Sequence, residues 1–366
     1  MAGSTHPSAV TIVSLRHETR FCTAPDGVGL AYAIDGEGPP LVKASNWMTH
    51  LDYERQSPVW RHWVRELSRA HTLVRYDERG CGLSDRQFAH PPSLDDFVGD
   101  LGAVVDAAGL ERFSLLALSG GGPTAIEYAA RNPGRVRSLI LYGTWARGRD
   151  WRGEEEAERS RVLGELIRIG WGGTVPAFRQ VFSSIYIPSA GEEEKRWYDE
   201  LQQVSSTGET AALLWRARNA VDVSDTARRI TQPALVLHAR HDGAVPYEEG
   251  RRLASLLPDA RFVTLDSDNH VLQEGEPAWE RFLAEVRAFL GDGEAARDDG
   301  GDLSELSVRE REVLELVAAG MSNEEIGERL VLSTRTVERH LSNVYVKLRL
   351  SGKSARAAAA ARYSRA

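Results

Sequence analysis

Short apolar runs alternate with amphipathic stretches through the first 290 residues of the chain. Between most of these runs, apolar residues recur at helical spacing, as in VWRHWVRELSRA (59–70) and EPAWERFLAEVRAFL (276–290). This alternation predicts an α/β fold, with a doubly wound, mostly parallel sheet and helices on both of its faces. The runs that we expect to be strands are 40–43, 72–76, 113–118, 136–142, 233–239 and 260–265.

One interval, residues 146–229, has no strand pattern. Its residues are charged and helical in their spacing, and it contains four of the nine Trp residues. We interpret it as a helical lid over one end of the sheet. We expect most of its aromatic side chains to form the lid's own core, and some to face a pocket that suits an apolar ligand. These side chains are Trp145, just before the interval, and Trp151, Trp171, Phe178, Phe182, Tyr186, Trp197, Tyr198 and Trp215.

The clearest boundary in the chain is GDGEAARDDGGD, residues 291–302. Because four Gly and five acidic residues cannot pack a core, we predict that this stretch is a flexible linker. A length of 366 residues also favours two domains. We therefore expect a first domain at 20–290, with its lid at 146–229, and a small second domain at 303–366.

Three helix starts follow the linker in quick succession. Ser307 and Ser322 each precede a Glu by three residues, which is the pattern of a capping box, and Ser333 is a further N-cap candidate. With a last helix from GKSARAAAAARY, the pattern predicts a small all-α domain of four helices. The apolar stripe of its third helix consists of Val337, Leu341, Val344, Tyr345 and Leu348.

The opposite face of that third helix is polar and basic. Residues 331–366 carry a net charge of +7, whereas residues 1–302 carry −11. A short helix, a tight turn and a longer helix with a basic face are typical of a helix-turn-helix in the major groove of DNA, commonly bound as a homodimer. The alternative is a solvated bundle whose charges contact nothing. The candidate DNA-binding residues are Ser333, Thr334, Arg335, Thr336, Glu338, Arg339, Ser342, Asn343 and Lys347.

The remaining composition argues against several classes of protein. No apolar run approaches the length that spans a bilayer, and the start of the chain lacks the pattern of a signal peptide. The only cysteines, Cys22 and Cys81, fit a reducing cytoplasm and argue against a disulfide scaffold or a cysteine-rich zinc site. We therefore expect a cytoplasmic protein without membrane contact, metal or cofactor.

Catalytic chemistry is suggested by FSLLALSGGGPTAIEYAA, in which an apolar strand, Ser119, a glycine run and a helix follow one another. Ala117 and Gly121 are small enough for the sharp turn that lifts a nucleophilic hydroxyl above a sheet edge. Such a serine needs a base, and the base needs an orienting acid. Asp242 and His270 each follow a predicted strand and complete a candidate triad, although each alone has an ordinary surface or core role as an alternative.

Residues 20–290 resemble the α/β-hydrolase superfamily. The resemblance rests on the small-x-Ser-x-Gly turn, on the order Ser119, Asp242, His270, and on YDERGCGLSD (76–85), which is similar to that superfamily's D-x-R-G-x-G-x-S segment. It implies a serine hydrolase of ester-like bonds, with the backbone N–H groups of Trp47 and Gly120 as the oxyanion hole. The usual His-Gly is replaced by Ser45-Asn46-Trp47, and although Asn46 tolerates unusual backbone angles, this departure predicts slow chemistry.

Residues 303–364 resemble the LuxR-type helix-turn-helix. The resemblance rests on LSVREREVLELVAAGMSNEEIGERLVLSTRTVERHLSNVYVKL and implies a DNA-binding module. Glu338 departs from it, because basic residues are frequent on that reading face. The acidic side chain is suited to accept a hydrogen bond from a cytosine amino group or to tune affinity.

The two resemblances lead to three hypotheses. In the first, the chain is a transcription regulator whose hydrolase-like domain binds a small apolar ligand, ester or lactone. In the second, it is an active serine hydrolase, esterase-like or lactonase-like, and the DNA module serves autoregulation. In the third, the hydrolase fold is degenerate and serves only as a dimerisation platform. The complete candidate triad argues against the third, and the DNA module argues against a plain enzyme.

Overall fold

The computed structural model describes residues 18–171, 173, 175–291, 306–348 and 355–363. The chain divides into two compact units, and the division falls between Val286 and Arg287. The predicted linker lies outside the described residues, apart from Gly291. Among the described helices, none is long and apolar enough to cross a membrane.

The first unit is built on one sheet of eight strands in the order β1-β2-β4-β3-β5-β6-β7-β8. The pairs from β4 to β8 are parallel, whereas β1 with β2 and β2 with β4 are antiparallel. The six predicted strands are confirmed to within one residue at each end. The strands are β1 Glu18–Thr23, β2 Gly29–Asp35, β3 Pro40–Ala44, β4 Thr72–Tyr76, β5 Phe113–Leu118, β6 Val136–Tyr142, β7 Ala234–Ala239 and β8 Ala260–Leu265.

The hairpin formed by β1 and β2 was not predicted. Most of β1 is exposed, and Phe21 at this edge is 67% exposed, so the strand lacks the apolar run of a buried one. The turn between the strands contains Pro25-Asp26-Gly27, with Gly27 at a φ of +93°. Asp-Gly after Pro is a strong turn signal, and it was the available clue to this hairpin.

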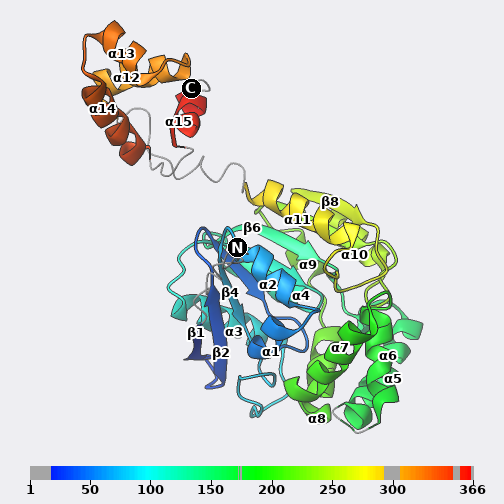
Figure 1. The fold of residues 1–366 in the computed structure, drawn as a ribbon. Helices are drawn as coiled ribbons and strands as arrows, with labels where there is room; N and C mark the ends of the chain where they lie inside the picture. Colours follow the sequence, from blue (N-terminus) through cyan, green and yellow to red (C-terminus); the bar gives the residue numbers. More distant parts are fainter. Residues whose placement is uncertain (1–17, 172, 174, 292–305, 349–354, 364–366) are drawn as a thin grey trace, which may run out of the picture. The chain divides into compact units, whose positions relative to one another are not determined.

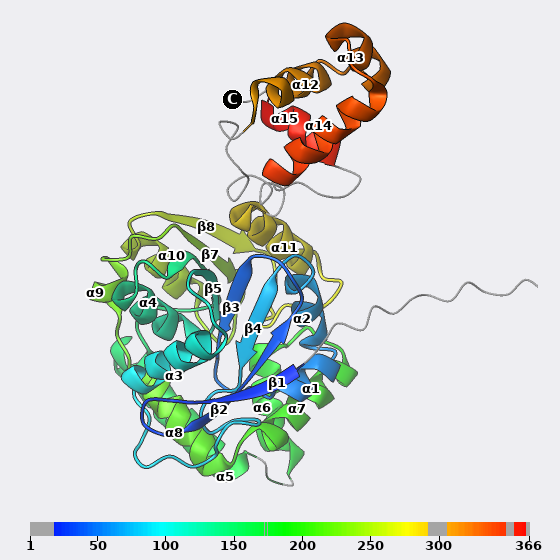
Figure 2. The same ribbon diagram turned by 90° about the vertical axis from the view of Figure 1, so that its left-hand side faces the viewer.

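Helices cover both faces of the sheet (Figure 2). On one face lie α3 (Leu94–Ala107), α4 (Gly121–Arg131) and α10 (Tyr247–Leu256), which pack aliphatic side chains on the strands. On the other lie α1 (Leu51–Gln56), α2 (Arg61–Leu67) and α11 (Pro277–Leu290). There Trp63 of α2 contacts Trp279 and Phe282 of α11, with ring centroids 4.7 Å and 4.8 Å apart. The doubly wound α/β prediction is confirmed.

Most helices of the interval predicted to be a lid lie together at one end of the sheet (Figure 1), whereas the short α9 (Ser224–Ala227) lies beside α4 and α10 (Figure 2). No described residue between β6 and β7 belongs to a strand, and the interval instead contains five α-helices and one 3-10 helix. Because every parallel strand points its carboxyl end toward the same edge, Ser119, Asp242 and His270, which follow β5, β7 and β8, meet near this lid. The elements are η1 Arg149–Trp151, α5 Glu154–Gly170, α6 Pro176–Tyr186, α7 Glu192–Ser205, α8 Gly208–Asn219 and α9 Ser224–Ala227.

The second unit contains the four predicted helices. Both capping boxes are formed, since Ser307 and Ser322 accept hydrogen bonds from the N–H groups of Glu310 and Glu325 and the two Glu side chains bond back. Val337, Leu341 and Val344 are buried along one stripe, as predicted from their spacing. The helices are α12 Val308–Ala318, α13 Asn323–Leu330, α14 Thr334–Lys347 and α15 Ala355–Tyr363.

Candidate functional site

Ser119 occupies the turn between β5 and α4. Its φ of +48° lies in the left-handed region, which costs a residue with a side chain about 1–2 kcal/mol. Its N–H donates to Tyr142 O at 3.1 Å, and its carbonyl accepts hydrogen bonds from Gly122 N–H at 3.1 Å and from Thr144 Oγ1 at 2.5 Å. Neighbouring groups therefore hold the serine in a strained conformation, as is common at active-site turns.

Gly121 and Gly122 are required because backbone and side-chain atoms approach them closely. A Cβ atom at Gly121 would lie 2.9 Å from the carbonyl oxygen of Ser45, and a Cβ atom at Gly122 would overlap Oγ1 of Thr144. Contacts this short force the backbone apart. The turn needs small residues at these positions because the end of β3 lies against Gly121 and the segment after β6 lies against Gly122.

The candidate acid and base are in direct contact. His270 Nδ1 lies 2.7 Å from Asp242 Oδ2, and both side chains are buried. The other carboxylate oxygen, Oδ1, accepts hydrogen bonds from the N–H groups of Ala244 and Val245 at 2.8 Å and 2.9 Å. Burial opposes ionisation of Asp242, but the charge and hydrogen bond of His270 outweigh it and hold the pKa of Asp242 below its usual value. Asp242 is therefore an ionised group that orients His270 through Nδ1.

A second histidine beside the acid was missed at the level of sequence. His238 on β7 places Nε2 3.5 Å from Asp242 Oδ2 and 3.0 Å from the carbonyl oxygen of Val245. Burial lowers the pKa of His238, so its neutral form donates from Nε2. In the sequence this residue reads only as one polar position in an apolar strand, four residues before Asp242.

Two small cavities meet at Ser119. The base-side cavity, of about 10 Å³, is bordered by Ser119 and His270, whose side chains do not hydrogen-bond to each other within the described structure. The lid cavity, of about 20 Å³, lies between Ser119 and Gly120 on one side and the lid on the other. Each has room for roughly one water molecule. The structure thus brings Ser119, Asp242 and His270 into one site with little free space.

The segment expected to supply the oxyanion hole is fixed by a buried lysine. Lys43 Nζ donates to Asn46 Oδ1 at 2.8 Å, and Asn46 Nδ2 donates to the carbonyl oxygen of Trp47 at 3.2 Å. The residue with a left-handed φ is Met48, at +69°, rather than Asn46. Trp47 borders both cavities and Gly120 borders the lid cavity, so both candidate donors lie at the site.

The ring of Trp47 lies among the lid's aromatic side chains. Its centroid is 4.8 Å from that of Trp171, 5.2 Å from that of Trp215 and 6.0 Å from that of Phe182. Not every aromatic residue of the lid is internal, because Trp151 is 56% exposed. Those that border a cavity are Trp145, Tyr186, Tyr198 and Trp215.

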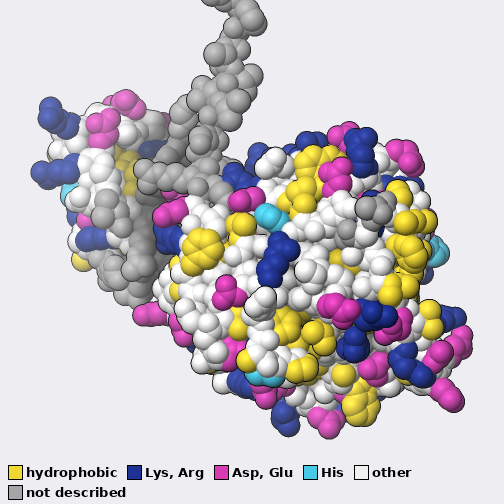
Figure 3. Space-filling view, turned by 90° about the horizontal axis from the view of Figure 1, so that it is seen from below, with side chains coloured by type: hydrophobic (Ala, Val, Ile, Leu, Met, Phe, Trp, Pro, Cys, Tyr) yellow, Lys and Arg dark blue, Asp and Glu magenta, His cyan; other side chains and the backbone are white. Residues whose placement is uncertain are grey.

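Arginine side chains at the site were also missed. Arg149, Arg152 and Arg218 border the lid cavity beside the aromatic residues. In the sequence they belong to a lid rich in charge, where charged side chains usually face solvent. Most do, and Figure 3 shows basic and acidic side chains interspersed over the face in view. Only the fold distinguishes these three arginines, which are buried or half-buried, from exposed ones such as Arg159, which pairs with Glu155 at 2.8 Å.

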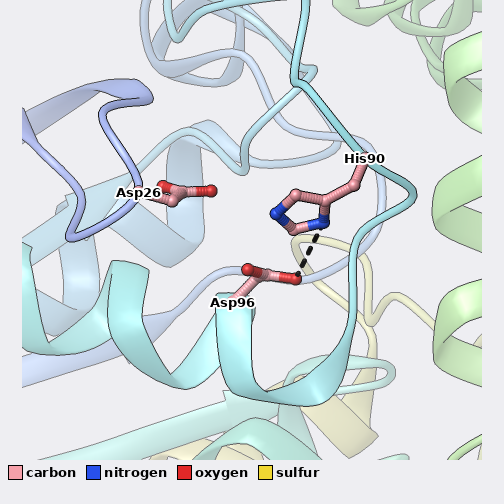
Figure 4. A group of neighbouring side chains, drawn as sticks. All are labelled: Asp26, His90 and Asp96. Carbon is pink, nitrogen blue, oxygen red and sulfur yellow. Dashed lines mark ion pairs between the residues drawn. The ribbon is translucent and has the colours of Figure 1, made fainter.

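Asp26, His90 and Asp96 form a separate cluster near the β1–β2 turn, with His90 Nδ1 3.9 Å from Asp96 Oδ2 (Figure 4). Its acidic groups already have partners. Arg79 donates to Asp26 Oδ2 at 2.7 Å, and the hydroxyl of Ser93 donates to Asp96 Oδ2 at 2.7 Å. We interpret the cluster as an ion-pair network that fixes this turn.

In the second unit, α14 exposes a polar face. Arg335 and Arg339 are exposed and form no ion pair with a described residue. The preceding turn is tight, since Leu332 N–H donates to Gly327 O at 2.8 Å and a Cβ atom at Gly327 would lie 2.8 Å from Leu332 O. Thr334 and Thr336 are half-buried, whereas Ser333, Glu338, Ser342 and Asn343 are exposed with the two arginines.

Three of the candidate DNA-binding side chains have structural partners, and two of these, Ser333 and Thr336, bond to each other, with their hydroxyl oxygens 2.8 Å apart. The Ser333 hydroxyl accepts a hydrogen bond from Thr336 N–H at 3.2 Å, as an N-cap does. Lys347 Nζ lies 2.6 Å from Glu310 Oε2, in the capping box of α12. Its ammonium therefore ties α14 to α12, and the free cations on the reading face are Arg335 and Arg339 among the described candidates.

Comparison with known proteins finds one family in each of two separate parts of the chain. Residues 53–277, more than half of the chain, match the family described as alpha/beta hydrolase fold. Residues 304–360 match the family described as bacterial regulatory proteins, luxR family. Each match lies within one of the two domains expected from the sequence.

Two relatives named as a deacetylase and a putative carbamate hydrolase, and one solved enol-lactonase, match the chain over nearly their whole length. Pyrrolizixenacetamide deacetylase of Xenorhabdus hominickii is 26% identical over 261 residues, which cover 71% of this chain and 94% of that protein. Putative carbamate hydrolase RutD of Azorhizobium caulinodans is 28% identical over 254 residues, which cover 68% and 90%. The solved enol-lactonase from Burkholderia xenovorans LB400 superposes with a TM-score of 0.62 at 27% identity, covering 74% of this chain and 99% of that one. The chain thus belongs to the alpha/beta hydrolase fold family, and it carries a DNA-binding domain of the luxR family of bacterial regulatory proteins.

Proposed function

We propose that the chain is a transcription regulator whose hydrolase domain binds, and slowly hydrolyses, a small ester or lactone. The observation that carries this proposal is the combination of an oriented Asp242–His270 pair and a strained Ser119 on the same chain as a helix-turn-helix. Ser119, Asp242 and His270 are suited to acyl transfer. The helix-turn-helix is suited to bind DNA, and it acts as a homodimer on paired half-sites.

The chemistry follows from the three side chains. Ser119 Oγ attacks the ligand's carbonyl carbon while His270 takes the hydroxyl proton, and Asp242 stabilises the resulting imidazolium. The backbone N–H groups of Trp47 and Gly120 bind the oxyanion. His270 then returns the proton to the leaving alcohol, and water hydrolyses the acyl-enzyme by the same steps. Ser119 and His270 are not hydrogen-bonded to each other within the described structure, and their contact forms when the ligand is bound.

Signalling follows from the size of the cavities. With room for roughly one water molecule in each, any ligand of several atoms requires the lid helices to move apart. A ligand that binds only the opened form shifts the population toward it. Occupancy of the site is therefore a sufficient signal, and turnover only ends it.

The test separates occupancy from turnover. Ser119→Ala removes one oxygen, so hydrolysis should fall by about 10⁶ while ligand affinity stays within about tenfold. A reporter driven by the target promoter should still respond to the ligand in Ser119→Ala cells. A silent reporter, with normal protein level and normal ligand affinity, would show instead that the acyl-enzyme or the product is the signal.

The second candidate function is that of an active hydrolase whose DNA module serves autoregulation. The ionised Asp242 and its 2.7 Å contact with His270 favour it, because a sensor that only needs occupancy does not need an oriented base. Steady-state hydrolysis of 4-nitrophenyl esters discriminates between the two. Turnover of many molecules per second, with no ligand effect on DNA binding, would favour this second function.

A further inference from the structure

We propose that the ligand carries a carboxylate, and that Arg152 of the lid binds it beside Ser119. The inference rests on the proposed function and deepens it from an apolar ligand to an anionic one. The first observation is the sign of the charges. Three described residues that border the lid cavity are arginines, whereas none of those that border it is Asp or Glu.

Two of these arginines have carboxylates of their own. Arg149 donates to Glu156 Oε2 at 2.8 Å and to the carbonyl oxygen of Ala244 at 2.5 Å. Arg218 donates from Nε to Glu78 Oε1 at 2.8 Å and from Nη1 to the carbonyl oxygen of Gly120. Their guanidinium groups are therefore occupied by the protein.

Arg152 is different. Its side chain is 4% exposed, and its Nε donates to the carbonyl oxygen of Arg147 at 3.0 Å. The carboxylate that contacts it is that of Glu249, with Oε2 3.9 Å from Nε, too far for a hydrogen bond. Glu249 is held at 2.9 Å by Arg147. Nη1 and Nη2 of Arg152 form no hydrogen bond with a described residue.

A buried cation in this state is poorly compensated. Glu249 is shared by two guanidinium groups, and the neighbouring Arg149 adds a further positive charge. Burial lowers the pKa of Arg152 to about 10, with the nearby arginines acting in the same direction and the glutamates opposing it. An anion that enters the lid cavity relieves this cost, because it brings both charge and hydrogen-bond acceptors.

The shape of the cavity favours a carboxylate among anions. Trp145 lies against Arg152, with the guanidinium carbon 5.3 Å from the ring centroid, and Trp145 and Trp215 both border the cavity. A planar carboxylate matches the two free terminal nitrogens of a guanidinium side by side, and it fits between aromatic rings. The substrate class is therefore an ester or lactone whose acyl chain ends in a carboxylate.

The experiment compares two ligands that differ only at that end. Monomethyl adipate and methyl hexanoate have acyl chains of the same length, one ending in a carboxylate and the other in a methyl group. Binding to the full chain in a Ser119→Ala background is followed by tryptophan fluorescence, because Trp145 and Trp215 border the cavity. We expect the half-ester to bind about tenfold or more tightly than the methyl ester, as charge-assisted hydrogen bonds do.

Arg152→Gln should abolish that preference. The matched control is Arg159→Gln, since Arg159 lies on the same lid but its side chain is 61% exposed, and it should keep the preference. Equal affinity of the two ligands for the Ser119→Ala chain that keeps Arg152 would overturn this inference but not the proposed function. A preference that survives in Arg152→Gln would do the same. Failure of both ligands to bind, with no effect of either on DNA binding, would count against the proposed function as well. Near-ultraviolet circular dichroism of Arg152→Gln identifies a variant that has lost its fold, in which case Arg152→Lys, which keeps the charge but not the fork, should retain a weaker preference.

Discussion

Arg218, in the last turn of lid helix α8, donates a hydrogen bond from Nε to Oε1 of Glu78 at 2.8 Å, and both residues are buried. Arg218 also donates to the carbonyl oxygens of Gly120 and Ser45. The lid is thus tied to the serine turn and to the loop after β3, which are the two backbone segments expected to hold the oxyanion.

We expect Arg218→Ala to lower the free energy of unfolding of the hydrolase domain by about 3–5 kcal/mol, because Glu78 is left buried without its cation. Urea unfolding measures the change. Replacing both residues, Arg218→Met with Glu78→Gln, should recover most of the loss, since no isolated charge remains. An unchanged midpoint in Arg218→Ala would mean that the ion pair contributes nothing.

Ser119 should react with a fluorophosphonate probe, and His270→Ala should abolish the labelling, because the hydroxyl then has no base. Asp268→Asn is the control. Asp268 is an exposed acid two residues before His270 and contacts only Ser189 among the described hydrogen bonds, so its variant should label normally. Equal labelling of the parent chain and His270→Ala would show that the triad is not assembled.

Arg339→Ala should weaken binding to an operator selected from random DNA by about 1–3 kcal/mol, since Arg339 is exposed on the reading face of α14. The hydrolase domain should remain folded. Arg159→Ala removes the same charge from the lid and should leave operator affinity unchanged. A gel-shift titration in which Arg339→Ala binds as the parent does would remove this residue from the DNA contacts.

Val331→Gly should stabilise the helix-turn-helix by about 1 kcal/mol. Val331 ends α13 with a φ of +55° and is 91% exposed, so a β-branched side chain is strained there without burying surface. Differential scanning calorimetry of the full chain should show the domain's melting temperature rising. Val308→Gly is the opposite control, because Val308 is also exposed but begins α12, where Gly lowers helix stability.

The stability of the hydrolase domain should fall as the pH is lowered from about 6.5 to 4, in part through His62. Burial lowers the pKa of His62 from 6.5 to about 4, so its neutral form is favoured on folding. The contribution of His62 to the free energy of unfolding is complete above pH 6.5 and is lost as the pH falls toward 4. Its maximum is about 3 kcal/mol. His62 Nε2 lies 3.0 Å from Leu272 O, and Nδ1 has no partner in the described structure for a second proton.

His62→Gln keeps a donor for Leu272 O but does not titrate. The difference in free energy of unfolding between pH 7 and pH 5 should therefore be smaller in this variant than in the parent chain. Identical pH dependence of the two proteins would show that His62 does not titrate in this range.

Much of the fold could be predicted because a strand that is buried on both faces of the sheet appears in the sequence as a continuous run of apolar residues. The strands β3 to β7 have this pattern, whereas β8 alternates, with only Val263 and Leu265 buried. The helices of the second unit are marked by Ser307 and Ser322. The edge strand β1 lacks such a run, since Phe21 faces solvent. The six strands β3 to β8 were predicted, including β8 at one edge of the sheet, whereas the hairpin of β1 and β2 at the other edge was missed, although β2 is mostly buried.

The candidate site could be predicted only where local geometry restricts residue type. Gly121 and Gly122 are small because other backbone and side-chain atoms approach them, and this restriction identified Ser119. Nothing local distinguishes Arg152 from Arg159, because the burial of one and the exposure of the other depend on how the lid packs. The same holds for Lys347, whose partner Glu310 is 37 residues away in the sequence.

The left-handed backbone of Ser119 has a consequence for the choice between sensor and enzyme. Glycine adopts a φ of +48° without steric cost, so a pocket that needed only to be filled would be more stable with glycine at this position. A hydroxyl kept there at a cost of about 1–2 kcal/mol weakens the domain unless the hydroxyl reacts or binds. Serine at position 119 therefore lowers the stability of a domain that only binds a ligand, whereas a nucleophilic serine in this strained turn is common in enzymes.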